Sequence, residues 1–405
     1  MTVTGLLGEI ADVGRDPRRG GYSRHGYSPV ESSLREWFAE AAARRDLDVH
    51  TDRNGNIWAW WGRPGPDAVI TGSHLDSVPG GGAFDGPLGV TSALAALDVL
   101  RASGFQPARP LALVVFTEEE GGRFGVPCLG SRLMSGSLDA DAARRLTDPD
   151  GITLAEAAAS VGLDPARLGT DEAALAGIGC FVELHVEQGR LMDRLPGTPS
   201  VAVASSILAH GRWRFTLTGT GNHAGTTEVP DRRDPMLPAA AAVLAARRAL
   251  GSRESARATV GRLVPTPGGT NVIASAVDFW LDARAPDGPE ARAVVAEVEA
   301  AAREAAAEEG CELTVREESY GGAVHFDSAL RDRLAAELGG PGGPVPVLPT
   351  GAGHDAGILA ARVPTAMLFV RNPTGISHAP AEHAEPADCA AGADALARVL
   401  ESLCR

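Results

Sequence analysis

The sequence alternates between short apolar runs and alanine-rich stretches, separated by polar loops that contain glycine. DAVITGSHLD at 67–76 is followed by GVTSALAALDVLRASG at 89–104, and LALVVFTEEEGGRFG at 111–125 leads to CLGSRLMSG at 128–136. Short β-branched runs indicate strands, and apolar residues at helical spacing indicate helices. Strands that alternate with helices predict an α/β fold with helices flanking a mostly parallel sheet.

The middle of the chain has a different character. GRWRFTLTGTGNHAG at 211–225 alternates as a strand, 234–251 and 289–310 have helical patterns, and 268–286 contains a strand pair. This order predicts a smaller α+β domain at 208–320, inserted into a catalytic domain made of 1–207 and 321–405. A chain of 405 residues has room for two domains, because single cores stop growing at roughly 250–300 residues.

Composition excludes several classes of function. The net charge is −15 with no basic cluster, which argues against a nucleic-acid partner. No apolar run approaches the roughly 18 residues of a membrane span, and the N-terminus lacks a signal-peptide pattern, so we expect a cytoplasmic protein without membrane contact. All basic residues are Arg, which excludes lysine Schiff bases, a Walker A lysine and a carbamylated lysine.

Polar residues cluster directly after the apolar runs, where α/β sheets bind ligands. The clusters contain His74, Asp76, Asp85, Glu118, Glu119, Glu120, His185, His378 and His383. Imidazoles and carboxylates without thiolates are a ligand set for zinc, manganese, cobalt or nickel. Three consecutive glutamates after a buried strand would repel one another unless cations lay between them, so the pattern predicts two divalent metal ions. The sequence itself does not distinguish the three glutamates.

Seven motifs then occur in one order along nearly the whole chain. They are GSHLDSVPGGGAFDGPLGV, FTEEEGGRFG, ELHVEQG, GNHAGTT, NVIASAVDFWLDAR, GAGHDAG and GISHAPAE. In these motifs the chain resembles the dinuclear metal amidohydrolases of the M20 metallopeptidase superfamily, in the branch of allantoate amidohydrolases and N-carbamoyl-L-amino-acid hydrolases. Peptidase and aminoacylase relatives carry a carboxylate at the position of His185, so His185 favours this branch.

The resemblance implies a role for each candidate residue. One metal ion would be bound by His74 and His185, the second by Glu120 and His378, and Asp85 would bridge them; Asp76 would orient His74, and Glu119 would be the general base. His383 is the alternative to His378. Manganese or zinc is preferred, with cobalt and nickel as alternatives.

For the inserted domain, the resemblance implies substrate recognition and dimerisation. Gln188, His223, Asn271 and Arg284 would bind substrate, with His223 stabilising the oxyanion and Arg284 gripping a carboxylate. The alternative for Arg284 is a surface ion pair with Asp282 or Asp287. Relatives are homodimers, so residues of this domain would act in the partner's site.

The expected reaction is hydrolysis of the carbamoyl C–N bond of a ureido acid, with release of ammonia and carbon dioxide. Allantoate is the leading substrate, and N-carbamoyl-L-amino acids or N-carbamoyl-β-alanine are the alternatives. An M20 aminoacylase or dipeptidase is a more distant alternative, and a non-catalytic binding protein another. The chain departs from the family pattern at Glu228 and Val229, which would affect substrate preference.

Overall fold

The computed structural model describes residues 1–251 and 253–405, which form two compact units. One unit comprises Met1–Ser205 and His325–Arg405, and the other comprises Ser206–Val324. The sequence prediction placed the inserted segment at 208–320, against 206–324 for the unit seen in the structure.

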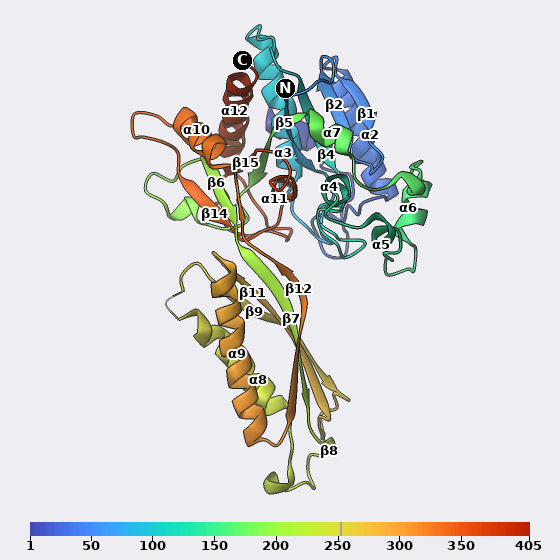
Figure 1. Ribbon diagram of the computed structural model, residues 1–405, viewed down its shortest axis with the longest axis vertical. Helices are drawn as coiled ribbons and strands as arrows, with labels where there is room; N and C mark the ends of the chain where they lie inside the picture. Colours follow the sequence, from blue (N-terminus) through green and yellow to red (C-terminus); the bar gives the residue numbers. More distant parts are fainter. Residues whose placement is uncertain (252) are drawn as a thin grey trace. The chain divides into compact units, whose positions relative to one another are not determined.

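The first unit is built on a mixed sheet with the strand order β1-β2-β4-β3-β5-β15-β6-β13, with β14 paired to β6 (Figure 1). Its strands are β1 (Asp48–Thr51), β2 (Ile57–Trp61), β3 (Ala68–His74), β4 (Leu111–Phe116), β5 (Ile178–Val186), β6 (Val201–Ile207), β13 (Val324–His325), β14 (Val347–Thr350) and β15 (Thr365–Val370). The central strands β4, β3, β5 and β15 run parallel, and β2 and β6 pair antiparallel on either side. The predicted α/β class with a mostly parallel sheet is confirmed.

Helices cover both faces of this sheet. They are α1 (Val3–Glu9), α2 (Pro29–Ala43), α3 (Pro87–Ala102), α4 (Leu129–Ser135), α5 (Ala140–Arg144), α6 (Leu154–Ser160), α7 (Glu172–Gly177), α10 (Ser328–Leu338), α11 (Asp355–Leu359) and α12 (Pro386–Leu403). Helices α1, α2, α3, α10 and α12 share one hydrophobic core with the sheet, while α11 packs on β5, β15 and α4. Strands β3, β4 and β15 are buried along their whole length, as expected for strands covered on both faces.

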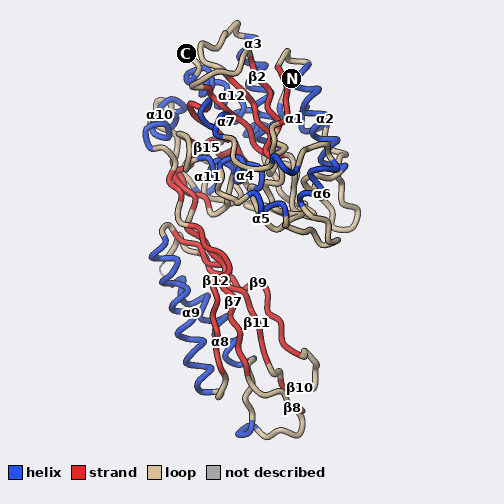
Figure 2. Tube along the Cα trace, turned by 45° about the vertical axis from the view of Figure 1, so that its right-hand side comes forward, coloured by secondary structure: helices blue, strands red, loops and turns tan. Residues whose placement is uncertain are grey.

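The inserted unit is an antiparallel sheet with two helices on one face (Figure 2). The strands, in the order β12-β7-β11-β9, are β7 (Ala209–Thr218), β9 (Arg257–Thr266), β11 (Ala276–Ala285) and β12 (Glu312–Gly321); β8 (Asn222–His223) pairs with β10 (Val272–Ile273). The helices α8 (Met236–Leu250) and α9 (Gly288–Glu308) pack together. Alternate residues of β11 are buried, and the rings of Phe215 and Phe279 stack at 4.7 Å in the core.

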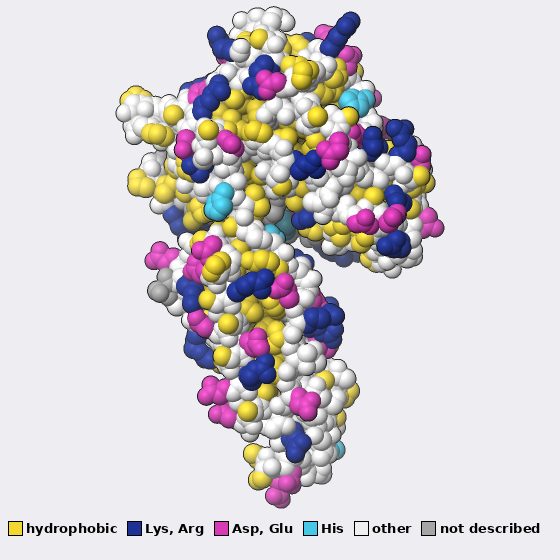
Figure 3. Space-filling view, in the orientation of Figure 1, with side chains coloured by type: hydrophobic (Ala, Val, Ile, Leu, Met, Phe, Trp, Pro, Cys, Tyr) yellow, Lys and Arg dark blue, Asp and Glu magenta, His cyan; other side chains and the backbone are white. Residues whose placement is uncertain are grey.

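Among the helices of the described residues, none has the length and apolarity needed to cross a bilayer. On the face shown in Figure 3, arginine and acidic side chains are interspersed. The cytoplasmic location stays a prediction.

Candidate metal centre

The carboxyl ends of the parallel strands carry the side chains that the sequence singled out. His74 is the last residue of β3, residues 118–120 follow β4, and His185 is the penultimate residue of β5. His378 lies in the loop after β15. Because His74 pairs in register with Phe116, the last residue of β4, the two strands end level. The segments therefore meet at one edge of the sheet, as expected for an α/β site.

Asp85 lies between two groups of donor atoms. Its Oδ1 is 3.1 Å from Nε2 of His185 and 3.6 Å from Nε2 of His74. Its Oδ2 is 3.4 Å from Nε2 of His378, which is 3.3 Å from Oε2 of Glu120. Within each group, one donor atom per residue lies within 4.8 Å of the others. A carboxylate whose two oxygens face different ligand groups is suited to bridge two cations.

The imidazoles of the first group are oriented through their other nitrogens. Nδ1 of His185 hydrogen bonds with the carbonyl of Val186 at 2.8 Å, and Nδ1 of His74 with the carbonyl of Asp76 at 3.1 Å. Their Nε2 atoms are buried and make no hydrogen bond with any other described residue. Such atoms are rare, and a ligating histidine normally donates its second N–H to a carbonyl or carboxylate. The residues therefore fit a divalent cation.

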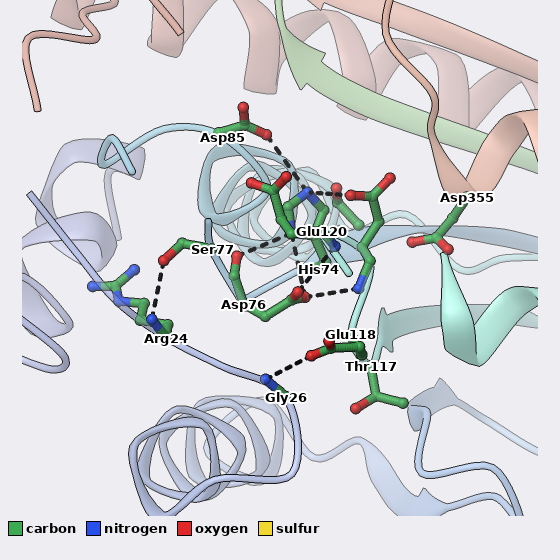
Figure 4. A network of polar contacts seen from close by, with 12 residues as sticks. Arg24, Gly26, His74, Asp76, Ser77, Asp85, Thr117, Glu118, Glu120 and Asp355 are labelled. Atoms are coloured by element: carbon green, nitrogen blue, oxygen red, sulfur yellow. Dashed lines mark hydrogen bonds and ion pairs between the residues drawn. The ribbon is translucent and has the colours of Figure 1, made fainter. Parts of the chain in front are cut away.

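Asp76 has two functions in the structure. Its Oδ1 is 3.5 Å from Nδ1 of His74, in the place expected for an orienting carboxylate. The same carboxylate accepts hydrogen bonds from the main-chain N–H groups of Glu119 at 3.1 Å and Glu120 at 3.0 Å (Figure 4). Asp76 thus also fixes the turn that carries the glutamates.

The three consecutive glutamates have different partners. Glu118 accepts hydrogen bonds from the main-chain N–H groups of Gly26, Arg123 and Phe124 at 2.7–3.1 Å, and Figure 4 shows the bond to Gly26. Glu120 faces His378 in the second donor group.

Glu119 belongs to neither donor group among the described residues. Its Oε2 is 3.7 Å from Nε2 of His74, and its Oε1 accepts a hydrogen bond from the thiol of Cys128 at 3.2 Å. Each glutamate therefore has a distinct environment, although the sequence did not separate them.

Burial and crowded charge shift the pKa values of these groups. Burial raises the pKa of Glu119, and burial together with Asp85 raises that of Glu120 to about 7. Burial lowers the pKa of His74, but Glu119, Asp76 and Asp85 outweigh this effect and hold it well above its ordinary value. A bound cation would favour ionised carboxylates and neutral imidazoles at this site.

Gln188 and His383 are placed differently with respect to this centre. Nε2 of Gln188 donates to Oδ2 of Asp85 at 2.8 Å and lies 3.3 Å from Nε2 of His378. His383 instead has its Nε2 3.3 Å from the partly exposed Glu385 and is absent from the donor groups of the described residues. The geometry favours His378 over His383 as the ligand.

A third donor group, formed by Glu183, His185 and His354, overlaps the first. The rings of His185 and His354 have centroids 4.5 Å apart. Glu183 already accepts hydrogen bonds from the hydroxyl of Ser73 at 2.8 Å and the main-chain N–H of Ala356 at 2.9 Å. Since His185 has one nitrogen left for a metal, the first and third groups would compete for that nitrogen.

Sequence reasoning missed two buried polar side chains. Cys128, which is absent from the candidate residues of the sequence analysis, contacts Glu119. Glu382, four residues after His378 in the SHAPAE motif, accepts hydrogen bonds from the main-chain N–H groups of Phe84 at 2.8 Å and Asp85 at 3.0 Å. The only sequence signal for Glu382 was its place in that motif.

The substrate-binding candidates of the inserted unit lie in two places. His223 in β8 and Asn271, which precedes β10, are exposed neighbours, and the carbonyl of Asn271 accepts from the N–H of Ala224 at 3.0 Å. Arg284 lies near the end of β11, eight residues beyond Ala276, where that strand begins. At about 3.4 Å per residue this separation is about 27 Å. His223 and Asn271 therefore lie at one end of the inserted sheet and Arg284 at the other.

The guanidinium of Arg284 grips a carboxylate of its own strand. Its Nε donates to Oδ1 of Asp282 at 2.8 Å and its Nη2 to Oδ2 at 3.0 Å. The ion pair that was the alternative in the sequence analysis is thus formed. Glu228 and Val229, where the family pattern breaks, lie in an exposed turn of the same unit.

Comparisons with known proteins agree with the resemblance seen in the motifs. The pattern of peptidase family M20/M25/M40 matches residues 70–402. The chain is 36% identical to an N-carbamoyl-L-amino acid amidohydrolase of Geobacillus stearothermophilus over 96% of this chain and 95% of that protein. It is 32% identical to the allantoate amidohydrolase of Escherichia coli (strain K12), covering 97% and 95%. A solved amidase of the hydantoinase/carbamoylase family from Burkholderia multivorans superposes with a TM-score of 0.87 at 31% identity, covering 100% and 97%.

We expect the wild-type protein to bind two Zn²⁺ or Mn²⁺ ions per chain, His378→Ala to bind one tightly, and His383→Ala to bind two. The reason is that His378 faces both Asp85 and Glu120, whereas His383 contacts Glu385. Metal analysis after equilibrium dialysis measures the stoichiometry. Two tightly bound ions in His378→Ala, or the loss of one in His383→Ala, would contradict this assignment.

Proposed function

Because the chain belongs to peptidase family M20/M25/M40, we propose that it is a metal-dependent amidohydrolase that cleaves the carbamoyl C–N bond of a ureido acid. The observation that carries the proposal is the geometry at Asp85. Its two oxygens face separate donor groups, and Glu119 lies next to these groups without belonging to either. The relatives named as amidohydrolases support a hydrolase acting on C–N bonds other than peptide bonds.

In this proposal the two donor groups hold two divalent cations, manganese or zinc by preference. His74 and His185 would hold one, Glu120 and His378 the other, and Asp85 both. When bound, such ions polarise a carbonyl oxygen and lower the pKa of water.

The side chains of the protein then move the protons. Glu119 would accept a proton from the attacking water as the new C–O bond forms at the ureido carbonyl. It would return that proton to the leaving nitrogen as the C–N bond breaks. The amine that carries the rest of the substrate leaves, and the carbamic acid that remains decomposes to ammonia and carbon dioxide. The thiol of Cys128 donates a hydrogen bond to Oε1 of Glu119. The other oxygen, Oε2, is thereby directed toward His74 and the proposed reaction centre.

Two substrates are candidates within the ureido acids. Allantoate is the one preferred from the sequence, and the allantoate amidohydrolase of Escherichia coli is 32% identical to this chain. An N-carbamoyl-L-amino acid is the second candidate, favoured by the 36% identity to the Geobacillus stearothermophilus relative. Both carry a ureido group and a carboxylate, which are the parts that the proposed site would recognise.

Two assays on the protein loaded with Mn²⁺ or Zn²⁺ test the substrate class directly: ammonia release from ureido acids, and release of the free amino acid from N-acetyl amino acids and dipeptides. We expect turnover of allantoate or of one or more N-carbamoyl-L-amino acids, and at least 100-fold lower kcat/KM on the matching N-acetyl amino acids and dipeptides, as an order of magnitude for polar discrimination. Turnover of acyl-amino acids or dipeptides in preference to every ureido acid would refute the proposal.

Glu119→Gln and Glu118→Gln form a matched pair that tests the general base. Glu119→Gln should lower kcat by about 10²–10⁴-fold with metal content unchanged, because it removes the proton acceptor. Glu118→Gln should instead lower the unfolding temperature, because one amide oxygen replaces a carboxylate that accepts three main-chain hydrogen bonds. Steady-state kinetics, metal analysis and thermal unfolding separate these effects; loss of metal from Glu119→Gln would refute its role.

We also propose that the inserted unit forms a homodimer and contributes His223 and Asn271 to the partner's active site. Two features support this. The helix α8 exposes an apolar stripe of Met236, Leu237, Val243 and Leu244, and β9 is an edge strand beside it. Apolar helix faces and unpaired strand edges are common at symmetric interfaces. In addition, the separation of about 27 Å prevents Arg284 from sharing one small substrate with His223 and Asn271 of the same chain.

Subunit mixing tests this arrangement. Inactive His223→Ala and Glu119→Gln proteins, mixed equally and allowed to exchange subunits, should regain about a quarter of wild-type activity, because half of the dimers then contain one intact site. A matched mixture of His223→Ala with Asn271→Ala should regain none, since both defects lie in the same contributing unit. Absence of recovery in the first mixture, after exchange is verified, would show that each site is built from one chain.

A further inference from the structure

We propose that Glu382 is a positioning residue that holds Asp85 in its bridging orientation before any metal ion binds. The inference rests on the proposed function only in taking Asp85 as a metal ligand. Glu382 is a buried carboxylate to which the sequence analysis assigned no role. It is absent from the donor groups of the described residues, so its oxygens serve another purpose.

The first part of the contact is with the main chain at Asp85. Oε1 of Glu382 accepts hydrogen bonds from the N–H groups of Phe84 at 2.8 Å and Asp85 at 3.0 Å. Two consecutive N–H groups bound to one carboxylate oxygen fix the direction in which the Asp85 side chain leaves the backbone.

The second part acts on the Asp85 side chain. The hydroxyl of Ser377 donates to Oδ2 of Asp85 at 3.0 Å and lies 3.4 Å from Oε2 of Glu382. Nε2 of Gln188 donates to the same Asp85 oxygen at 2.8 Å. Backbone and side chain of Asp85 are thus both held, and Oδ1 is left to face the imidazoles of the first donor group.

The same contact accounts for Gly82, the last glycine of the run before Asp85. A Cβ added at Gly82 would lie 2.3–2.4 Å from the side chain of Glu382. Any larger residue there would push the carboxylate away from the N–H groups of Phe84 and Asp85. Gly82 therefore lets the loop close over Glu382.

The contact also joins two distant parts of the chain. Glu382 lies 297 residues from Asp85 in sequence but only four from His378, whose imidazole faces Oδ2 of Asp85. One carboxylate thus ties the bridging ligand to the segment that supplies a terminal ligand. Residues that orient metal ligands typically change metal affinity by about 10–100-fold when mutated.

The experiment measures metal binding without substrate, so its failure is distinct from failure of the proposed activity. Apo protein is titrated with Zn²⁺ against a fluorescent chelator. Glu382→Met removes the acceptor at similar length and should weaken binding of at least one ion by about 10–100-fold. Glu382→Gln keeps an acceptor oxygen and should stay within about threefold of wild type, as should the matched control Glu385→Met on the same segment.

Gly82→Ala provides a second approach should Glu382→Met fail to fold. It should weaken Zn²⁺ binding similarly by displacing Glu382, whereas Gly8→Ala, with no atom within 4 Å of the added Cβ, should not. Wild-type affinity in Glu382→Met, or in Gly82→Ala if the former is unfolded, would overturn the proposal. Equal losses in Glu382→Gln and Glu382→Met would also overturn it, because hydrogen-bond acceptance would then not be the operative property.

Discussion

The burial of several carboxylates at one edge of the sheet is the constraint on which the first unit depends. Asp76, Asp85, Glu118 and Glu119 are each less than 7% exposed, and like charges removed from water repel strongly. The structure compensates them in two ways. Asp76 and Glu118 accept main-chain N–H groups, whereas Asp85 and Glu119 face imidazoles. Carboxylates of the first kind build the loops, and those of the second kind face the site, Asp85 as a candidate metal ligand and Glu119 as the candidate base.

The carboxylates that build the loops lie next to those that face the site, and this proximity links metal binding to the stability of the loops. The N–H groups that satisfy Glu118 come from residue 26 and from residues 123 and 124, so two segments are drawn together around a side chain adjacent to Glu119. The ligands are therefore ordered during folding, and little ordering remains when the ions bind. Because the ions would also relieve the repulsion among the remaining carboxylates, their binding would stabilise the folded unit by mass action.

Sequence patterns predicted those features of the site that depend on the order of neighbouring residues along the chain. Apolar runs followed by His74, Glu119 and His185 predicted strand ends, and parallel strands bring such ends together. The different environments of the three glutamates were not predictable from pattern, because they depend on partners outside the motif: Gly26, 92 residues away, for Glu118 and Cys128 for Glu119. The motif resemblance supplied the choice among them. For Glu382 even the resemblance assigned nothing, since its contact spans 297 residues.

Distance, rather than charge, limits which of the proposed binding residues of the inserted unit can contact one substrate. The pairing of Arg284 with Asp282 does not prevent it from binding a substrate carboxylate, because both side chains are about one-third exposed and exposed pairs contribute only about 0–1 kcal/mol. Exchange of one carboxylate for another is therefore inexpensive. A ureido acid, however, spans roughly 7 Å from carboxylate to carbamoyl nitrogen, far less than the separation between Arg284 and His223. Since Arg284 and His223 are proposed to contact the same substrate, they would come from two chains. Substrate affinity and subunit association would then be thermodynamically linked, and dissociation of the dimer would weaken binding even with the metal centre intact.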